Sequence, residues 1–215
     1  PLFIDRNYYF NTLGITTDDL HRNESYLNNA KRLRGVGHHQ NYNDFLKSLE
    51  MSAILKPFDS ANEQRITQLI NKTNQFNLTG IRVTRSQVVE AIDSLHHVTL
   101  YAKLYDKFGD SGLVSIVMGD VREQTLRINI WVMSCRVFKR TLEGCVMNIL
   151  VRICLERDIK IIEGLYVPTE KNEIVSGHYQ TMGFNKSEDE SGSVIWRLEL
   201  SEFREINTMV RKKLI

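Results

Sequence analysis

A long amphipathic helix between two apolar strands is the feature that most constrains the fold of this 215-residue chain. From Thr141 to Arg157, apolar side chains recur with the period of a helix. They are Leu142, Cys145, Val146, Ile149, Leu150, Ile153 and Cys154. The runs Thr125–Met133 and Lys160–Val167, on either side, are typical of strands. Because a long helix separates these strands, we expect them to pair in parallel through a crossover.

The strands before this helix are joined by short connections. Val98–Tyr105, Gly112–Gly119 and Thr125–Met133 follow one another closely, which predicts an antiparallel meander. Other segments predict a strand at 52–57, a helix at 62–76, a short strand at 81–83, a helix at 84–94, a helix at 171–182, a strand at 194–200 and a C-terminal helix from Ser201. The predicted fold class is α/β (α+β), with a mixed, mostly antiparallel sheet flanked by helices.

The first 50 residues have a different pattern and predict a helical adapter. Thr16 and Thr17 precede an acidic turn, as at a capped helix start, and a second short helix is expected around Phe45–Leu49. We therefore divide the chain into an adapter, 1–50, and a main domain, 51–215. Because the chain begins with Pro1 and not Met, we expect it to be part of a longer polypeptide.

Composition excludes several classes of protein. The 28 basic and 26 acidic residues nearly cancel and are mixed along the chain, which argues against nucleic acid or an anionic membrane as a partner. No apolar run reaches the length of a spanning helix, and no signal peptide is visible, so a cytoplasmic location is expected. Three cysteines form neither a zinc spacing nor an even disulfide set, and the adjacent histidine pairs His38–His39 and His96–His97 do not converge. We predict no metal.

Ser134-Cys135-Arg136 lies where the strand 125–133 meets the start of the long helix. Unpaired N–H groups at a helix N-terminus attract anions, and nearby positive charge stabilises a thiolate. Cys135 is therefore either a nucleophile for acyl transfer or a small buried residue, as free cysteines usually are. Cys145 and Cys154 lie on the apolar face of the helix and are expected in the core.

The order of elements from 51 to 200 resembles the GNAT acyltransferase fold. In that family, a loop of the form R/Q-x-x-G-x-G/A binds the pyrophosphate of coenzyme A. The matching segment here is Arg136-Val137-Phe138-Lys139-Arg140-Thr141, in which both glycines are replaced. Because close backbone approach to a pyrophosphate usually needs glycine, the resemblance leaves ordinary acetyl-CoA binding open to question.

Four local motifs resemble the C-terminal half of FkbH-like proteins, the HAD-like subfamily IIIC enzymes of polyketide biosynthesis. They are the segments 72–79 (KTNQFNLT), 108–114 (FGDSGLV), 131–137 (WVMSCRV) and 167–172 (VPTEKN). The resemblance implies transfer of a glyceryl group from 1,3-bisphosphoglycerate to the phosphopantetheine thiol of an acyl carrier protein, for methoxymalonyl-type precursors. It also implies a HAD-like phosphatase domain with an Asp-x-Asp motif and magnesium. This chain has no Asp-x-Asp motif, so we expect that half, and its magnesium, to be absent.

The resemblance also implies roles for individual residues. Tyr179 falls where many GNAT enzymes keep a tyrosine that protonates a leaving thiolate, although a packed, half-buried tyrosine would fit the same pattern. The remaining candidates are substrate-binding or phosphopantetheine-binding groups, or else turn and capping residues: Asn74, Gln75, Asn77, Thr79, Ser134, Arg136, Lys139, Arg140, Thr169, Lys171 and Asn172.

Three functions follow as alternatives. The first is the acyltransfer half of an FkbH-like enzyme with Cys135 as an acyl relay. The second is a conventional acyl-CoA N-acetyltransferase, and the third is a non-catalytic module that docks a carrier protein. Exposure of Cys135 in an ordered pocket argues against the third, and a filled apolar core around it argues for the third.

Overall fold

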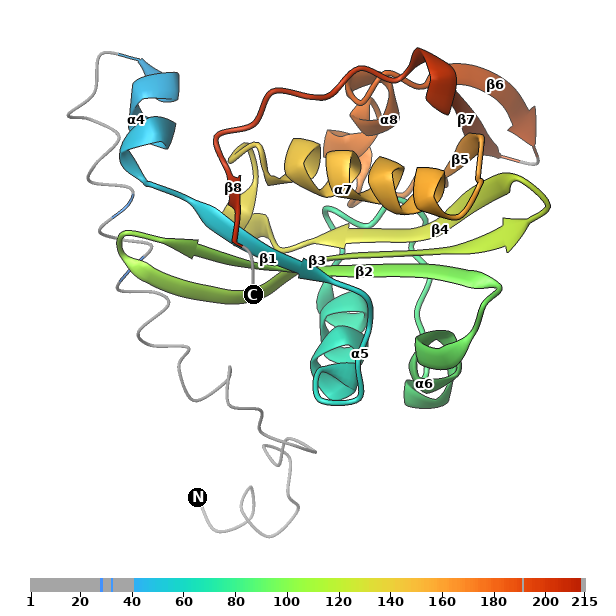
Figure 1. Cartoon of the computed structure of the whole chain (residues 1–215), viewed down its shortest axis with the longest axis horizontal. Helices are drawn as coiled ribbons and strands as arrows, with labels where there is room; N and C mark the ends of the chain where they lie inside the picture. Colours follow the sequence, from blue (N-terminus) through green and yellow to red (C-terminus); the bar gives the residue numbers. More distant parts are fainter. Residues whose placement is uncertain (1–27, 29–31, 33–40, 191, 214–215) are drawn as a thin grey trace, which may run out of the picture.

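The computed structural model describes residues 28, 32, 41–190 and 192–213. Helices α7 and α8 cover one face of a central sheet, and α5 and α6 cover the other (Figure 1). The helices are α4 Tyr42–Ser48, α5 Glu63–Lys72, α6 Arg85–Asp93, α7 Leu142–Glu156 and α8 His178–Thr181, with short 3-10 turns η1 Cys135–Val137, η2 Glu173–Val175 and η3 Leu200–Glu202. The strands are β1 Ser52–Lys56, β2 His97–Asp106, β3 Gly109–Arg122, β4 Thr125–Met133, β5 Ile161–Tyr166, β6 Asn185–Glu190, β7 Ser193–Glu199 and β8 Arg211–Lys212.

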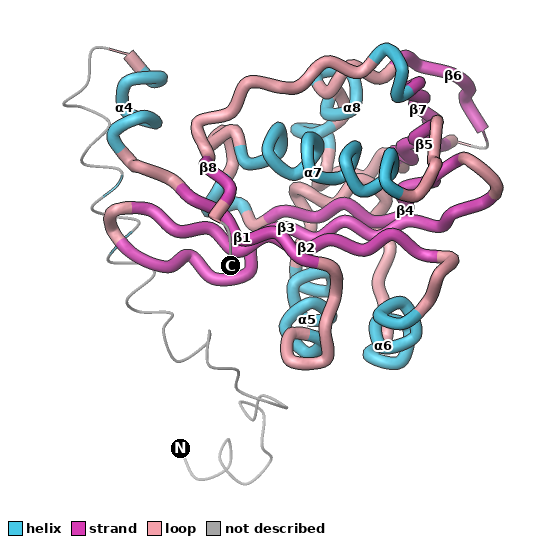
Figure 2. Tube along the Cα trace, in the orientation of Figure 1, coloured by secondary structure: helices cyan, strands magenta, loops and turns pink. Residues whose placement is uncertain are grey.

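The sheet has the strand order β6-β7-β5-β4-β3-β2-β1-β8. β2, β3 and β4 form the expected antiparallel meander, and β5 pairs in parallel with β4 across the α7 crossover, as predicted. β1 pairs antiparallel with β2. Figure 2 shows α7 lying across the strands that it connects. The predicted fold class is therefore confirmed: a mixed, mostly antiparallel sheet flanked by helices.

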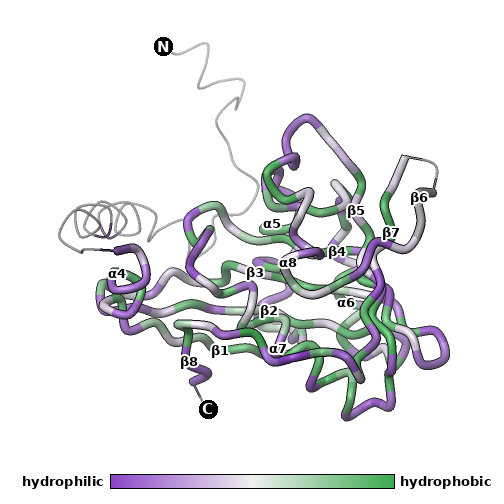
Figure 3. Tube along the Cα trace, turned by 90° about the horizontal axis from the view of Figure 1, so that it is seen from above, coloured by the Kyte–Doolittle hydropathy of each residue, from purple (hydrophilic) through white to green (hydrophobic). Residues whose placement is uncertain are grey.

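Helix α7 contributes many of the residues of the larger hydrophobic core. Its buried residues include Leu142, Val146 and Leu150, which belong to the same buried cluster as apolar residues of β4 and β5 such as Leu126 and Ile162. A smaller cluster on the other face of the sheet joins α5 and α6 to β2, β3 and β4. Figure 3 shows hydrophobic residues concentrated along the central strands and hydrophilic ones toward the outer loops.

Helix α4 packs into the larger core. Phe45 and Leu46 are buried, together with Leu49 just after the helix, in the same cluster as α7. The described end of the predicted adapter thus shares its core with the main domain. The helix expected from Thr16 lies outside the described residues.

The predicted C-terminal helix is wrong. After η3 the chain runs extended over α7 and ends in β8, beside β1 (Figure 1). Asn148 on α7 holds this segment: its amide donates to Ile206 O at 2.8 Å, and Ile206 N donates back to Asn148 Oδ1 at 2.9 Å. Gly144, one turn earlier, leaves room for Ile206, because a Cβ there would lie 2.8 Å from Ile206 Cγ2. We call residues 203–210 the C-terminal strap.

Two smaller predictions also differ from the structure, and one strand was not predicted. The helix predicted at 171–182 is broken into η2 and α8, with Ser176 and Gly177 between them. Residues 81–83 form a loop and not a strand, and the strand β6 was not predicted.

Candidate functional site

β4 and β5 stay paired over only part of their length. The pairing runs from Thr125↔Ile161 to Ile128↔Gly164, although β4 continues to Met133 and β5 to Tyr166. At the same point Asn129 is an extra residue in β4, because Ile128 pairs with Gly119 and Ile130 with Met118. The end of β4 therefore offers N–H and C=O groups to something other than β5.

Residues Phe76–Leu78, which we call the insert, form hydrogen bonds with those groups. Met133 N donates to Phe76 O at 3.0 Å, and Leu78 N donates to Trp131 O at 3.3 Å. On the opposite side, Val167 N donates to Leu78 O at 2.8 Å. Asn77 forms an antiparallel bridge with Val132. The insert thus links β4 to the residue that follows β5.

Asn172 locks the insert in place. It is fully buried, and its amide nitrogen donates to Asn77 O and to Val167 O, both at 2.9 Å. Its oxygen accepts from Thr169 N at 2.8 Å and from the Tyr166 hydroxyl at 3.3 Å. Both amide hydrogens and the carbonyl are engaged within the chain, so the structure gives Asn172 a positioning role.

Asn77 and Thr79 also serve the local backbone. Asn77 Oδ1 accepts from Gly80 N at 2.9 Å, and the Thr79 hydroxyl donates to Asn129 O at 2.8 Å. Of the other two residues in this predicted group, Asn74 accepts from Arg82 and Gln75 is exposed. The capping alternative therefore describes Asn77 and Thr79.

An aromatic cluster lies beside the insert. The His178 ring packs edge-on against Trp131 and Phe76, with ring centroids 4.5 and 4.8 Å away, and Tyr179 lies 5.7 Å from His178. All four residues are buried. Sequence reasoning missed His178 and Trp131, because an isolated histidine in a short helix carries no pattern that marks it.

Three polar atoms of this cluster have no hydrogen-bond partner among the described residues. They are Trp131 Nε1, His178 Nε2 and the Tyr179 hydroxyl. Burial lowers the pKa of His178 to about 3, so the ring is neutral, and burial raises the pKa of Tyr179. The Tyr179 ring also lies directly over Gly164, where a Cβ would be 2.3 Å from the ring. Tyr179 is therefore a packed tyrosine, the alternative given in the sequence analysis, and its hydroxyl is buried.

Cys135 lies just beyond the end of β4 and is exposed. Ser134, which is buried, anchors this turn because its N–H donates to Val114 O at 2.8 Å. Arg136 Nε reaches back to Ser134 Oγ at 3.3 Å. By contrast, Cys145 and Cys154 are buried on α7, and burial raises their pKa values to about 11 and about 12.

The loop from η1 to α7 keeps two left-handed residues. Lys139 and Thr141, at the positions where the GNAT pattern has glycine, both have φ of 60°. One oxygen of each residue accepts a hydrogen bond: Tyr42 donates to Lys139 O at 3.0 Å, and Met209 N of the C-terminal strap donates to Thr141 Oγ1 at 2.9 Å. At both positions the loop therefore adopts the left-handed backbone conformation that glycine favours.

Glu143 stands in the first turn of α7. Its carboxylate interacts with its own N–H, while the buried Oε2 has no hydrogen-bond partner in the part of the chain that the structure describes. Burial raises the pKa of this carboxyl group. The helix terminus thus already carries an acidic group where an anion would bind.

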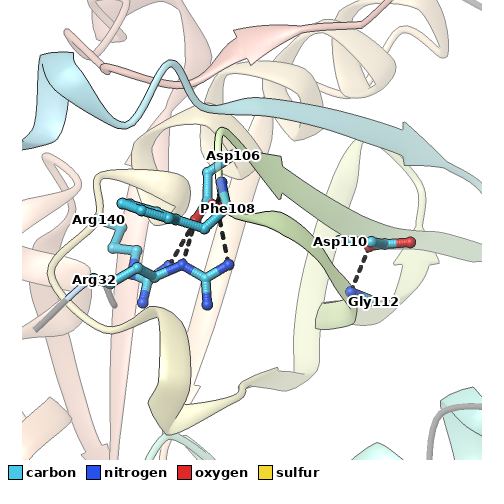
Figure 4. Close-up of polar contacts among 6 residues, drawn as sticks. All are labelled: Arg32, Asp106, Phe108, Asp110, Gly112 and Arg140. Atoms are coloured by element: carbon cyan, nitrogen blue, oxygen red, sulfur yellow. Dashed lines mark hydrogen bonds and ion pairs between the residues drawn. The ribbon is translucent and has the colours of Figure 1, made fainter. Parts of the chain in front are cut away.

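Arg140 was predicted to contact phosphate but is buried in an ion-pair cluster. Its Nη1 lies 3.4 Å from Asp106 Oδ2, and Asp106 also pairs with Arg32 (Figure 4). Burial, together with the nearby Arg32 charge, lowers the pKa of Arg140. Lys139, Thr169 and Lys171 are exposed, so they lie at the surface as binding residues would.

A cavity of about 510 Å³ lies elsewhere, over the starts of β4 and β5. Sequence reasoning did not single out its lining: Asp120, Arg122, Glu123, Thr125, Arg127, Asn129, Glu163 and Leu165. Cys135 is not part of it. Among the described residues, no group of three His, Cys, Asp or Glu side chains is placed to hold a metal. No helix in the described part of the chain is long and apolar enough to span a membrane.

Comparison with known proteins identifies the fold. No protein-family model matches the chain, and no curated protein matches its sequence. Solved structures do match. The ribosomal-protein-S18-alanine N-acetyltransferase of Escherichia coli has a TM-score of 0.53 at 9% identity, covering 71% of this chain and 97% of that one. The PaiA N-acetyltransferase of Thermoplasma acidophilum, solved with coenzyme A, has a TM-score of 0.53 at 11% identity, covering 69% and 99%.

A third match names the fold family. The GNAT domain of S. lividans PAT has a TM-score of 0.54 at 12% identity, covering 67% of this chain and 89% of that one. At these identities the likeness concerns the fold. The FkbH-like resemblance stays a prediction. The chain has the GNAT fold.

Proposed function

We propose that this chain is an acyltransfer domain that carries an acyl group on Cys135 and passes it to the phosphopantetheine thiol of an acyl carrier protein. The observation that carries the proposal is the exposure of Cys135 at the end of β4, whereas both other thiols are buried in the core. The GNAT fold, common among acetyltransferases, supports acyl transfer as the reaction class.

The chemistry requires two exchanges at one carbonyl carbon. In the first, the Cys135 thiolate attacks an acyl phosphate, a C–S bond forms, and the C–O bond to phosphate breaks as phosphate leaves. In the second, the carrier thiolate attacks the thioester, a new C–S bond forms, and the bond to Cys135 breaks. Arg136, next to the cysteine and hydrogen-bonded to Ser134, would favour the negative charge on the departing sulfur.

The finer assignment comes from the FkbH-like resemblance. We propose a glyceryl group from 1,3-bisphosphoglycerate as the acyl donor, and a HAD-like, magnesium-dependent phosphatase domain as the partner that removes the remaining phosphate. The product would supply methoxymalonyl-type units for polyketide synthesis in the cytoplasm.

Two other functions are weighed by particular contacts. A conventional acyl-CoA N-acetyltransferase would share the fold, but the insert Phe76–Leu78 already pairs with β4. A non-catalytic module for docking a carrier protein would be favoured by a filled apolar core around Cys135, but Cys135 is exposed. An acyl relay requires the exposed thiol of Cys135, whereas a docking module does not.

The test joins this chain to its HAD-like partner domain. The pair is incubated with 1,3-bisphosphoglycerate and its intact mass is measured, with Cys145→Ala as the matched control. We expect one acyl adduct in the wild type and in Cys145→Ala, and none in Cys135→Ala. Equal acyl loading of Cys135→Ala, or no added mass in the wild type, would rule out Cys135 as the acyl carrier.

A further inference from the structure

The point where β4 separates from β5 is where an extended ligand with amide groups would bind by pairing with a strand edge. The pantetheine arm of coenzyme A is such a ligand, since it carries two amides. We infer that the insert Phe76–Leu78 occupies that position in this chain, so that coenzyme A does not bind between β4 and β5.

The hydrogen bonds of the edge support the inference. Two groups of β4 on the side away from β3, Trp131 O and Met133 N, are bonded to the insert at 3.3 and 3.0 Å. The opposing group, Val167 N, is bonded to Leu78 O. A pantetheine amide would have to break these bonds before it formed its own.

The insert is also held from the side. Asn172 donates to Asn77 O and to Val167 O, which joins the middle of the insert to the end of β5. Thr79 adds a bond to Asn129 O, at the extra residue of β4. Because Asn172 is fully buried and has all its hydrogen-bonding groups engaged, the insert is a fixed part of the sheet.

The space beside the insert is filled as well. The rings of Trp131 and His178 meet edge-on at 4.5 Å, and Phe76 of the insert closes the cluster at 4.8 Å from His178. Phe138, from the loop before α7, packs on Phe76 at 5.4 Å. Side chains therefore fill the position where the arm would continue toward α7.

The phosphate end of the ligand meets an unfavourable group too. The carboxylate of Glu143 lies in the first turn of α7, where the N–H groups would receive a pyrophosphate. Thr141, at the helix start, is engaged by Thr208 and Met209 of the C-terminal strap. Like charges repel strongly in such a partly buried place.

The inference does not depend on the acyl relay, because a carrier-bound arm can meet the exposed thiol of Cys135 from solvent. Amide hydrogen exchange by NMR tests it, using the whole chain with and without 1 mM coenzyme A. We expect the amides of Leu78, Met133 and Val167 to exchange as slowly as those of the β2–β3 ladder, and coenzyme A to leave them unchanged.

The lock is tested with Asn172→Ala, and exposed Asn185→Ala serves as the control. We expect Asn172→Ala to speed exchange at Leu78 and Val167 at least tenfold more than at Leu100 in β2; Asn185→Ala should have no such effect. Should Asn172→Ala fail to fold, Asn172→Asp, which keeps the acceptor and loses both donors, replaces it.

Each outcome decides the inference. Saturable binding of coenzyme A that removes protection at Leu78 and Met133 overturns it, and so does loop-like exchange of these amides in the free wild type. If the Asn172 variants speed exchange at Leu78 and Val167 no more than at Leu100, Asn172 does not hold the insert in place. Binding that leaves the amides protected places the ligand outside this cleft and supports the inference. None of these readouts depends on whether Cys135 becomes acylated.

Discussion

Arg32 donates two hydrogen bonds to the carboxylate of Asp106, from Nε at 2.6 Å and from Nη2 at 2.9 Å. Arg140 reaches the same carboxylate from the loop before α7, and Phe108 N donates to it from the β2–β3 turn at 2.9 Å (Figure 4). The Asp106 side chain has no exposed surface. One carboxylate therefore ties residue 32, the hairpin and the loop that follows Cys135 together.

Removing the charge of Asp106 should be costly. In Asp106→Asn, two buried guanidinium groups lose their carboxylate, and breaking a buried pair in this way costs about 3–5 kcal/mol. Urea unfolding measures the loss. Asp110→Asn is the control, because Asp110 is exposed and the asparagine side chain retains the oxygen that accepts from Gly112 N. This variant should change the free energy of unfolding by no more than about 0.5 kcal/mol. Equal losses in the two variants would contradict the cluster's role.

The contact between Tyr179 and Gly164 predicts a second pair of variants. Gly164→Ala places a Cβ 2.3 Å from the Tyr179 ring, and overpacking of this kind costs about 1–3 kcal/mol. At Gly177 a Cβ would meet no atom of the described residues within 4 Å, and φ is −89°, so Gly177→Ala should change stability by about 0.5 kcal/mol or less. Thermal unfolding of both variants makes the comparison; a harmless Gly164→Ala would mean that the ring does not rest on β5.

The buried histidine predicts a loss of stability in acid. His178 has a pKa of about 3 in the folded chain against 6.5 as its ordinary value, so the unfolded chain binds the extra proton between these values. Stability from this group is intact above pH 6.5 and falls as the pH drops toward 3. At pH 4.5 the loss is about 2–3 kcal/mol.

His178→Phe, which keeps an aromatic ring and cannot be protonated, should remove this part of the pH dependence. Unfolding free energies at pH 7 and pH 4.5 give the comparison, with His96→Phe, at an exposed position, as the control. An unchanged difference between the two pH values in His178→Phe would show that the ring is not buried and neutral.

The three thiols should differ sharply in reactivity. Burial raises the pKa of Cys145 to about 11 and that of Cys154 to about 12, and both side chains are covered, whereas Cys135 is exposed. At pH 8, iodoacetamide should modify Cys135 on the order of a hundredfold faster than the other two. Peptide mass spectrometry after timed labelling measures the rates. Comparable rates at Cys145 would contradict the packing of α7.

The sequence predicted the elements whose pattern is local. The period of the apolar residues fixed α7, and the length of that helix implied the parallel pairing of β4 and β5. The prediction of a C-terminal helix was wrong because residues 203–210 are positioned by contacts with Asn148 and Gly144, which are far away in the sequence. No local pattern encodes such contacts.

The site was only partly visible from the sequence. Cys135 stood out because it follows an apolar strand and precedes a basic turn. The amide side chains at 74–79 were noticed, but the backbone of this segment is held by Asn172 and by the end of β4, dozens of residues away. Arg140 was predicted to bind phosphate because nothing near it in the sequence indicates Asp106 as its partner.

Thioester exchange on the isolated chain tests the central claim most directly. The chain is mixed with a glyceryl thioester of pantetheine, and intact mass and peptide mapping follow the acyl group. In this exchange the Cys135 thiolate displaces the pantetheine thiolate, which then takes up a proton, and no other reagent is needed. We expect one glyceryl group on Cys135, lost again when free pantetheine is added in excess, and no adduct in Cys135→Ala. An unmodified wild-type chain, or an adduct that persists in Cys135→Ala, would contradict the account.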